Sequence, residues 1–155
     1  MKRTFSYDSP VGRIYIAESD GVITDLFMRP VEGAIEEETP LLKLAAKMLQ
    51  EYFDGGRKDF EGLPFRADGT VFQKQAWEAL LTIPYGQTRS YKEQAGAIGN
   101  IKACRAVGAA NGKNPISIII PCHRVIGSNK QLTGYGGGLD VKKALLELER
   151  KHSED

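Results

Sequence analysis

The order of apolar and polar positions predicts β-strands at the start of this 155-residue chain. Over the first thirty residues, apolar side chains recur at alternate positions in three short runs, which is the pattern of half-buried strands. Ser9-Pro10 and Asp20-Gly21 separate the runs and supply turns, the second with a glycine that tolerates a positive φ. We therefore predict an antiparallel three-stranded meander.

A helix is predicted to follow the meander. Thr39 is a suitable N-cap, and Pro40 fits the first helical position. Apolar residues then recur with helical spacing as far as Phe53, and Gly55-Gly56 ends the helix. This half of the chain contains no histidine, cysteine or glycine-rich phosphate loop, so we place no chemistry in it.

The segment 57–69 shows neither the alternation of a strand nor the spacing of a helix, and we interpret it as a linker. Thr70 then caps a helix that continues to Leu81. The length permits one domain or two small ones, and we predict domains at 1–67 and 70–155. The expected fold class is α+β, with a sheet and a helix first and a mostly helical remainder.

A helix-turn-helix is predicted at about residues 91–111. Ser90 and Glu93 have the spacing of a capping box, which begins a short helix. A Gly-Asn turn ends that helix, and Asn100 can cap a second one over 101–111.

The second of these helices is unusually smooth. Arg105 is flanked on its helical face by Lys102, Gly108 and Ala109. Such a face can approach a groove closely and insert one long cation, but it reads few base edges. A glycine inside a helix lowers its stability by roughly 1 kcal/mol relative to alanine, so the presence of Gly108 requires an explanation. Either a partner approaches closely there, or helices pack tightly inside the protein.

Residues 116–125 carry the candidate chemistry. The β-branched run 116–120 predicts a buried strand that stops at Pro121, which cannot donate to a ladder. Cys122 then lies at a strand end beside His123, one of two histidines in the chain. Two interpretations remain open: a nucleophilic thiol with a neighbouring base, or a small buried hydrophobic residue. Neighbours on a strand point to opposite faces, so cooperation requires the chain to turn at Pro121.

The formal net charge of +1 conceals an asymmetry between the two halves. Residues 1–69 contain nine basic and thirteen acidic side chains, whereas 70–155 contain twelve and seven. Around the candidate thiol, between Pro84 and Lys143, nine basic residues face only two acidic ones. This excess favours an anionic partner, with nucleic acid the leading candidate, over a basic surface that binds nothing.

Composition narrows the setting further. We expect no membrane segment, because no apolar run approaches the length of a bilayer span, and no signal peptide, because the basic start lacks an apolar core behind it. The two cysteines fit neither a disulfide framework nor a zinc site. We therefore expect a cytoplasmic protein with reduced thiols.

The chain ends in a glycine-rich loop and an amphipathic helix. The loop spans 127–138 and carries Tyr135 between two glycines. In the helix, Glu149 lies close to the apolar side. The residues expected to face outward are Lys142, Lys143, Glu147 and Arg150.

These features together resemble the O6-alkylguanine-DNA alkyltransferases, also called methylated-DNA–protein-cysteine methyltransferases. The order and spacing match the family from about Thr70 to Arg150. The matching runs are Pro121-Cys122-His123-Arg124-Val125, Arg105-Ala106-Val107-Gly108, Asn114-Pro115, Gly134-Tyr135 and Gly137-Gly138-Leu139. The resemblance implies a ribonuclease-H-like antiparallel sheet plus helix, followed by a winged helix-turn-helix-like domain.

The family resemblance also implies a substrate. Its members bind double-stranded DNA through the minor groove, flip out an O6-alkylguanine, and also accept O4-methylthymine. Arg105 is expected to fill the vacated stack, and Tyr91 to crowd the adjacent phosphate. The other residues expected at the DNA are Ser90, Ala106, Gly108, Ala109 and Arg124.

The expected reaction is a single irreversible alkyl transfer to Cys122, so the enzyme is consumed as it acts. By resemblance, His123 is the base, acting through a water, and Glu149 holds its tautomer. Tyr135 donates to the guanine O6, and Asn114 braces the cysteine. We expect no cofactor, no metal and a monomer.

Some features depart from the family pattern, and alternatives remain. Gly136 stands where many relatives have a hydroxyl residue, and Cys104 has no assigned role beyond packing. The zinc-binding cysteines of some relatives are missing from the first half. The alternatives are a non-catalytic binder of alkylated DNA, which the presence of Cys122 disfavours, a helix-turn-helix regulator, and a thiol hydrolase that turns over.

Overall fold

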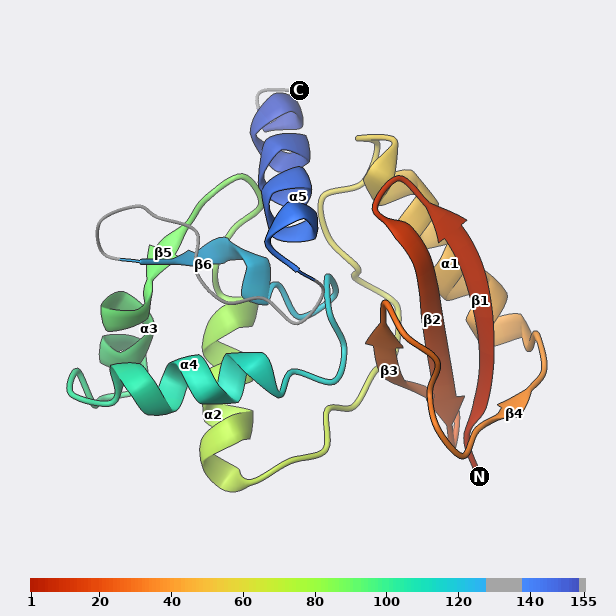
Figure 1. Ribbon diagram of the computed structural model, residues 1–155, viewed down its shortest axis with the longest axis horizontal. Helices are drawn as coiled ribbons and strands as arrows, with labels where there is room; N and C mark the ends of the chain where they lie inside the picture. The colour runs from red at the N-terminus through yellow and green to blue at the C-terminus, as the bar shows by residue number, and fades with distance from the viewer. Residues whose placement is uncertain (128–137, 154–155) are drawn as a thin grey trace. The chain divides into compact units, whose positions relative to one another are not determined.

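The computed structural model describes residues 1–127 and 138–153 (Figure 1). The chain divides into two compact units, Met1–Asp68 with Pro115–Ile119 and Gly69–Asn114 with Ile120–Asp155. The segment Pro115–Ile119 therefore packs with the first unit, although it comes late in the chain. The domain limits of 1–67 and 70–155 stay a prediction.

The first unit is built on a four-stranded sheet in the order β3-β2-β1-β4. The predicted meander is present as β1 (Arg3–Ser9), β2 (Gly12–Ser19) and β3 (Val22–Phe27), all antiparallel neighbours. Asp20 and Gly21 both have positive φ, as a type I′ hairpin turn requires. The short β4 (Ile35–Glu36) pairs parallel to β1, so the sheet is mixed rather than purely antiparallel as expected.

Helix α1 (Pro40–Phe53) packs against the sheet. The Thr39 side chain accepts a hydrogen bond from the backbone N–H of Leu42 at 3.2 Å, which confirms the predicted cap. The helix buries its apolar stripe against the strands because residues three and four apart share one face. The buried members include Leu42, Leu49 and Tyr52 from the helix, and Ile14 and Ile16 from β2.

The strand predicted at 116–120 is not formed. Only Ile116 makes a bridge, to Leu26, where the Leu26 N–H donates to the Pro115 carbonyl at 2.8 Å. Ile118 has φ of 71°, a left-handed conformation that ends any extended run and is unusual for a β-branched residue. The segment is buried, as predicted, but it is a turn.

The second unit consists mainly of α2 (Val71–Leu81), α3 (Tyr91–Ala97), α4 (Cys104–Gly112) and α5 (Leu139–His152). Two short parallel strands, β5 (Arg89–Ser90) and β6 (Val125–Ile126), lie beside these helices. The predicted capping box at Ser90 and Glu93 is present at the start of α3.

Helix α4 begins at Cys104, three residues later than predicted. The Asn100 side chain accepts from the backbone N–H of Lys102, and the Asn100 carbonyl accepts from Ala103. Asn100 therefore closes a turn between the helices rather than capping the second helix.

Buried hydrogen bonds fix α4 against its neighbours. The Trp77 indole N–H of α2 donates to the Ala110 carbonyl at 2.8 Å. The amides of Gln94 and Asn111 exchange two hydrogen bonds, and Gln94 also donates to the Ala76 carbonyl. Because each of these groups is satisfied only in this arrangement, the network sets the orientation of α4 relative to α2 and α3.

Candidate active site

The cysteine motif lies on a single 3₁₀ turn, η1 (Cys122–Arg124). Pro121 precedes the turn, and its carbonyl accepts from the Arg124 N–H at 3.1 Å. Successive side chains on a 3₁₀ helix diverge by about 120°, so Cys122 and His123 no longer point to opposite faces. The expected change of direction at Pro121 is therefore present, although no strand leads into it.

The Cys122 thiol is buried and has an amide donor beside it. The side chain is 8% exposed, and the Asn114 Nδ2 donates to Sγ at 3.3 Å and to the Ile120 carbonyl at 2.8 Å. Burial raises the pKa of Cys122, and the Asn114 hydrogen bond and the charge of Lys142 partly oppose this. The thiol therefore needs a base at the moment of reaction.

Lys142 is buried on α5, contrary to the expectation that it faces outward. Burial lowers the pKa of its ammonium group, whereas the Cys122 thiolate would raise it. The spacing to Leu145 and Glu149 places all three residues on one helical stripe. That spacing is the signal that could have placed Lys142 inside the protein.

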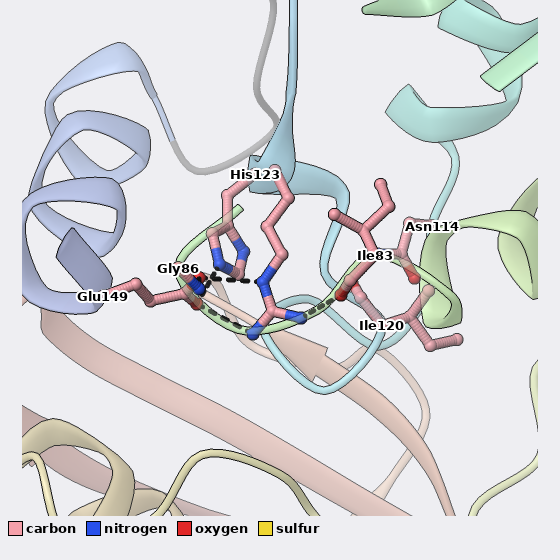
Figure 2. Close-up of polar contacts among 7 residues, drawn as sticks. Ile83, Gly86, Asn114, Ile120, His123 and Glu149 are labelled. Carbon is pink, nitrogen blue, oxygen red and sulfur yellow. Dashed lines mark hydrogen bonds and ion pairs between the residues drawn. The ribbon is translucent and has the colours of Figure 1, made fainter. Parts of the chain in front are cut away.

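His123 and Glu149 form a buried pair (Figure 2). The imidazole Nε2 lies 2.6 Å from Oε2 of Glu149, and the two side chains are 0% and 1% exposed. Burial lowers the pKa of His123 most strongly; Glu149 raises it, while the charges of Arg124 and Lys142 lower it further. An ionised carboxylate accepts, so the imidazole N–H lies on Nε2. Within the described residues, His123 Nδ1 has no hydrogen-bond partner, so its lone pair can accept a proton.

Glu149 is held by three groups besides His123. Arg124 donates from Nε to Oε1 at 2.8 Å and from Nη2 to Oε2 at 3.0 Å, and the Gly86 N–H donates to Oε1 at 3.2 Å. Burial would raise the pKa of Glu149, but His123 and Arg124 outweigh it and lower the pKa to about 2. Glu149 is therefore a carboxylate throughout the neutral range.

Arg124, expected at the DNA, is buried, and its DNA contact stays a prediction. Its side chain is 9% exposed, and its guanidinium binds Glu149 and the Ile83 carbonyl. The contacts that the structure gives to the guanidinium are therefore internal ones. The contributions of Ile83 and Gly86 were missed from the sequence, because both act through backbone atoms that no side-chain pattern reveals.

The other expected DNA contacts gather on α3 and α4. Arg105, Ala106 and Ala109 are exposed, and Tyr91 and Gly108 are half-buried. A Cβ built on Gly108 would lie 3.7 Å from the Tyr91 ring, which is an ordinary contact. Tight internal packing therefore does not explain why a glycine stands at position 108. The explanation that remains is a partner that approaches this helix closely. Ser90 caps α3 through its side chain.

The remaining candidates add little to this site. Tyr135 lies outside the described residues. Cys104 is half-buried, with Sγ 3.4 Å from the Ile101 carbonyl. The described residues contain no cluster of histidine, cysteine and acidic side chains that could hold a metal ion. Nor does this part of the chain contain a helix long and apolar enough to span a membrane.

Two models of one protein family match the chain. The ribonuclease-like domain of 6-O-methylguanine DNA methyltransferase matches residues 2–67, and the DNA binding domain of the same protein matches residues 71–151. The two matches confirm the family resemblance found in the sequence, including its ribonuclease-like first half.

Individual relatives give the same result. The methylated-DNA–protein-cysteine methyltransferase of Mycolicibacterium paratuberculosis is 48% identical, over 94% of this chain and 91% of its own. The constitutive enzyme of Bacillus subtilis is 46% identical, over 92% of both chains. The crystal structure of Mycobacterium tuberculosis O6-methylguanine methyltransferase superposes with a TM-score of 0.91 at 45% identity, covering 98% of this chain and 94% of that one. The chain thus belongs to the 6-O-methylguanine DNA methyltransferase family.

Proposed function

We propose that this chain, as a methylated-DNA–protein-cysteine methyltransferase, repairs O6-alkylguanine in double-stranded DNA by moving the alkyl group irreversibly to Cys122. The carrying observation is a buried thiol bonded to Asn114 and followed by a histidine whose Nε2 is held by Glu149. A Mycobacterium tuberculosis relative, 47% identical, forms a complex with DNA, which supports DNA as the partner. The chain acts as a monomer and needs no cofactor, since the lesion supplies the alkyl group and the thiol accepts it.

The first step is recognition through the minor groove. The exposed face of α4 carries small residues around Arg105, which supports a close approach to the groove floor. Arg105 enters the stack in place of the flipped nucleotide, and Tyr91 crowds the adjacent phosphate. Binding through phosphates and shape selects damage rather than sequence.

The second step is the transfer. An ordinary cysteine is only about 3% thiolate at pH 7, and burial reduces that share further. His123 Nδ1 takes the thiol proton through a water, and the sulfur attacks the alkyl carbon as its bond to O6 breaks. The electron pair of that bond passes to the purine, with Tyr135 donating to O6. The proton then returns to the purine, which leaves as neutral guanine in the repaired DNA.

The product limits each molecule to one reaction. A thioether on Cys122 is stable, and the described structure offers no group to remove the alkyl chain. The same chemistry applies to O4-methylthymine, whose alkyl group is also bonded to an exocyclic oxygen. Both cysteines are free, which supports a reducing, cytoplasmic setting.

The test is incubation with a duplex that carries one O6-methylguanine, followed by mass measurement of the Cys122 peptide. We expect a gain of one methyl group per molecule and restored guanine, with neither change in Cys122→Ala. Cys104→Ala is the matched control and should react like the unaltered chain. An unmodified peptide after binding would indicate a non-catalytic binder, and repeated turnover would indicate a hydrolase; either outcome refutes the proposal.

A further inference from the structure

We propose that Arg124 is a positioning residue for the transfer, which clamps Glu149 so that His123 stays a neutral base with its free lone pair on Nδ1. The inference rests on the proposed function, because it assigns a task within that reaction. It also replaces the expected phosphate contact of Arg124 with an internal one.

The contacts of the guanidinium support this role. Nε and Nη2 donate to the two oxygens of Glu149 at 2.8 and 3.0 Å, the parallel fork in which arginine binds a carboxylate. Nη1 donates to the Ile83 carbonyl at 2.7 Å, just beyond the end of α2. The Tyr85 ring lies 5.7 Å from Cζ. Arg124 therefore ties α5 to η1 and to the end of α2 through one rigid group.

The clamp leaves the carboxylate one orientation. Oε1 accepts from Arg124 and the Gly86 N–H, and Oε2 accepts from Arg124 and His123 (Figure 2). With four donors on two oxygens, Glu149 cannot rotate without losing several hydrogen bonds. Its Oε2 stays aligned with Nε2, and this fixes the imidazole N–H on that nitrogen and the lone pair on Nδ1.

The charge of Arg124 also affects the protonation of His123. A buried carboxylate alone would favour an imidazolium, because the ion pair offsets burial. Because the Arg124 cation already neutralises Glu149, the carboxylate stabilises a protonated His123 only weakly. In accord with this, Arg124 lowers the pKa of His123 while Glu149 raises it. The charged side chains of α2, Lys74 and Glu78, are exposed. The titratable groups around His123 on η1 and α5 are Cys122, Arg124, Lys142 and Glu149.

Three variants separate clamping from charge. Arg124→Met removes both the fork and the cation, Arg124→Lys keeps the cation without the fork, and Arg124→Met/Glu149→Gln removes both charges. Single-turnover transfer from an O6-methylguanine duplex is measured from pH 5 to 9 for each, with circular dichroism to verify folding. Affinity for an unmodified duplex is measured by fluorescence anisotropy.

We expect Arg124→Met to move the acid limb of the pH–rate profile up by about one unit, which lowers the rate below that limb about tenfold. The double variant should return the limb toward its original position, although its plateau rate stays low because the tautomer is no longer fixed. Arg124→Lys should keep the limb in place and lower the plateau several-fold. Affinity for unmodified DNA should stay within twofold in all three.

Other results would overturn the inference. An unmoved limb in folded Arg124→Met, or the same displacement in the double variant, would exclude the charge balance. If Arg124→Met does not fold, Arg124→Lys decides: a plateau equal to that of the unaltered chain, or a loss of DNA affinity, refutes the clamp. If the unaltered chain transfers no methyl group, the proposed function itself fails, and that outcome is distinct from these.

Discussion

Replacing Glu149 with glutamine should destabilise the chain by about 3 kcal/mol at pH 7. The carboxylate is buried, and its interactions lower its pKa from 4.5 to about 2. A shift of about 2.5 units corresponds to about 3 kcal/mol of stability, since one unit is worth about 1.4 kcal/mol. Glutamine keeps the shape but leaves the Arg124 cation buried without a counter-charge, and breaking such a pair costs about 3–5 kcal/mol.

The sign of the pH dependence follows from the lowered pKa. As the pH falls, the unfolded chain takes up the proton before the folded one does, so folding loses stability. The contribution of Glu149 is complete above pH 4.5 and disappears toward pH 2, with about 1 kcal/mol lost by about pH 3.5. His123, whose pKa is also lowered, acts in the same direction, beginning near its ordinary value of 6.5.

Urea unfolding at pH 7, 4.5 and 3.5, followed by the fluorescence of the single buried tryptophan, Trp77, measures both effects. The stability gap between the unaltered chain and Glu149→Gln should narrow at the lowest pH. Glu147→Gln is the matched control, because Glu147 is exposed and pairs with Arg150 on the same helix, so stability should hardly change. Equal costs for the two variants, or a gap that does not depend on pH, would contradict the assigned role of Glu149.

Three further predictions test single positions. Gly108→Ala should stabilise the fold by up to about 1 kcal/mol in urea unfolding while weakening duplex binding several-fold by anisotropy; unchanged binding would remove the case for a close approach. Lys142→Met should raise the pKa of the Cys122 thiol, so iodoacetamide labelling should reach half its maximal rate at higher pH; an unchanged midpoint would show that its charge is not felt. Gly86→Ala should cost about 2 kcal/mol, because φ is 78° and the new Cβ would lie 2.6 Å from that of Ser153; Gly86→Ala/Ser153→Gly should recover only the steric part.

The elements of the fold that depend on local signals were predictable. Thr39 and Ser90 cap helices as expected, and the turn at Asp20-Gly21 joins two strands. The prediction of a strand at 116–120 was wrong because a β-branched run indicates burial but not an extended backbone. The left-handed conformation of Ile118 turns the chain there. The ends of the elements were predicted less accurately than their existence, as the late start of α4 shows.

The candidate site was predictable in its adjacent members and not in its distant ones. Cys122 and His123 are neighbours in the chain, and the pairing of His123 with Glu149 came from a resemblance, not from spacing. Lys142 was expected to face outward because a basic residue in an amphipathic helix is usually exposed to solvent, and Arg124 was expected at the DNA because of the family resemblance. Their burial depends on partners from other elements, which one sequence does not show. The role of Tyr135 stays a prediction.

The division of the chain into two units also determines which fragments of the protein can fold. The second unit is interrupted by Pro115–Ile119, which packs in the first unit, and the residues on either side, Asn114 and Ile120, are joined by a 2.8 Å hydrogen bond. A fragment that starts at Gly69 would keep the reactive cysteine but deprive Ile116 and its neighbours of the sheet edge at Leu26. Those isoleucines would then face water, each at a cost of about 1.5–3 kcal/mol. The N-terminal half therefore keeps Pro115–Ile119 buried, the segment that directly follows the amide bonded to the thiol.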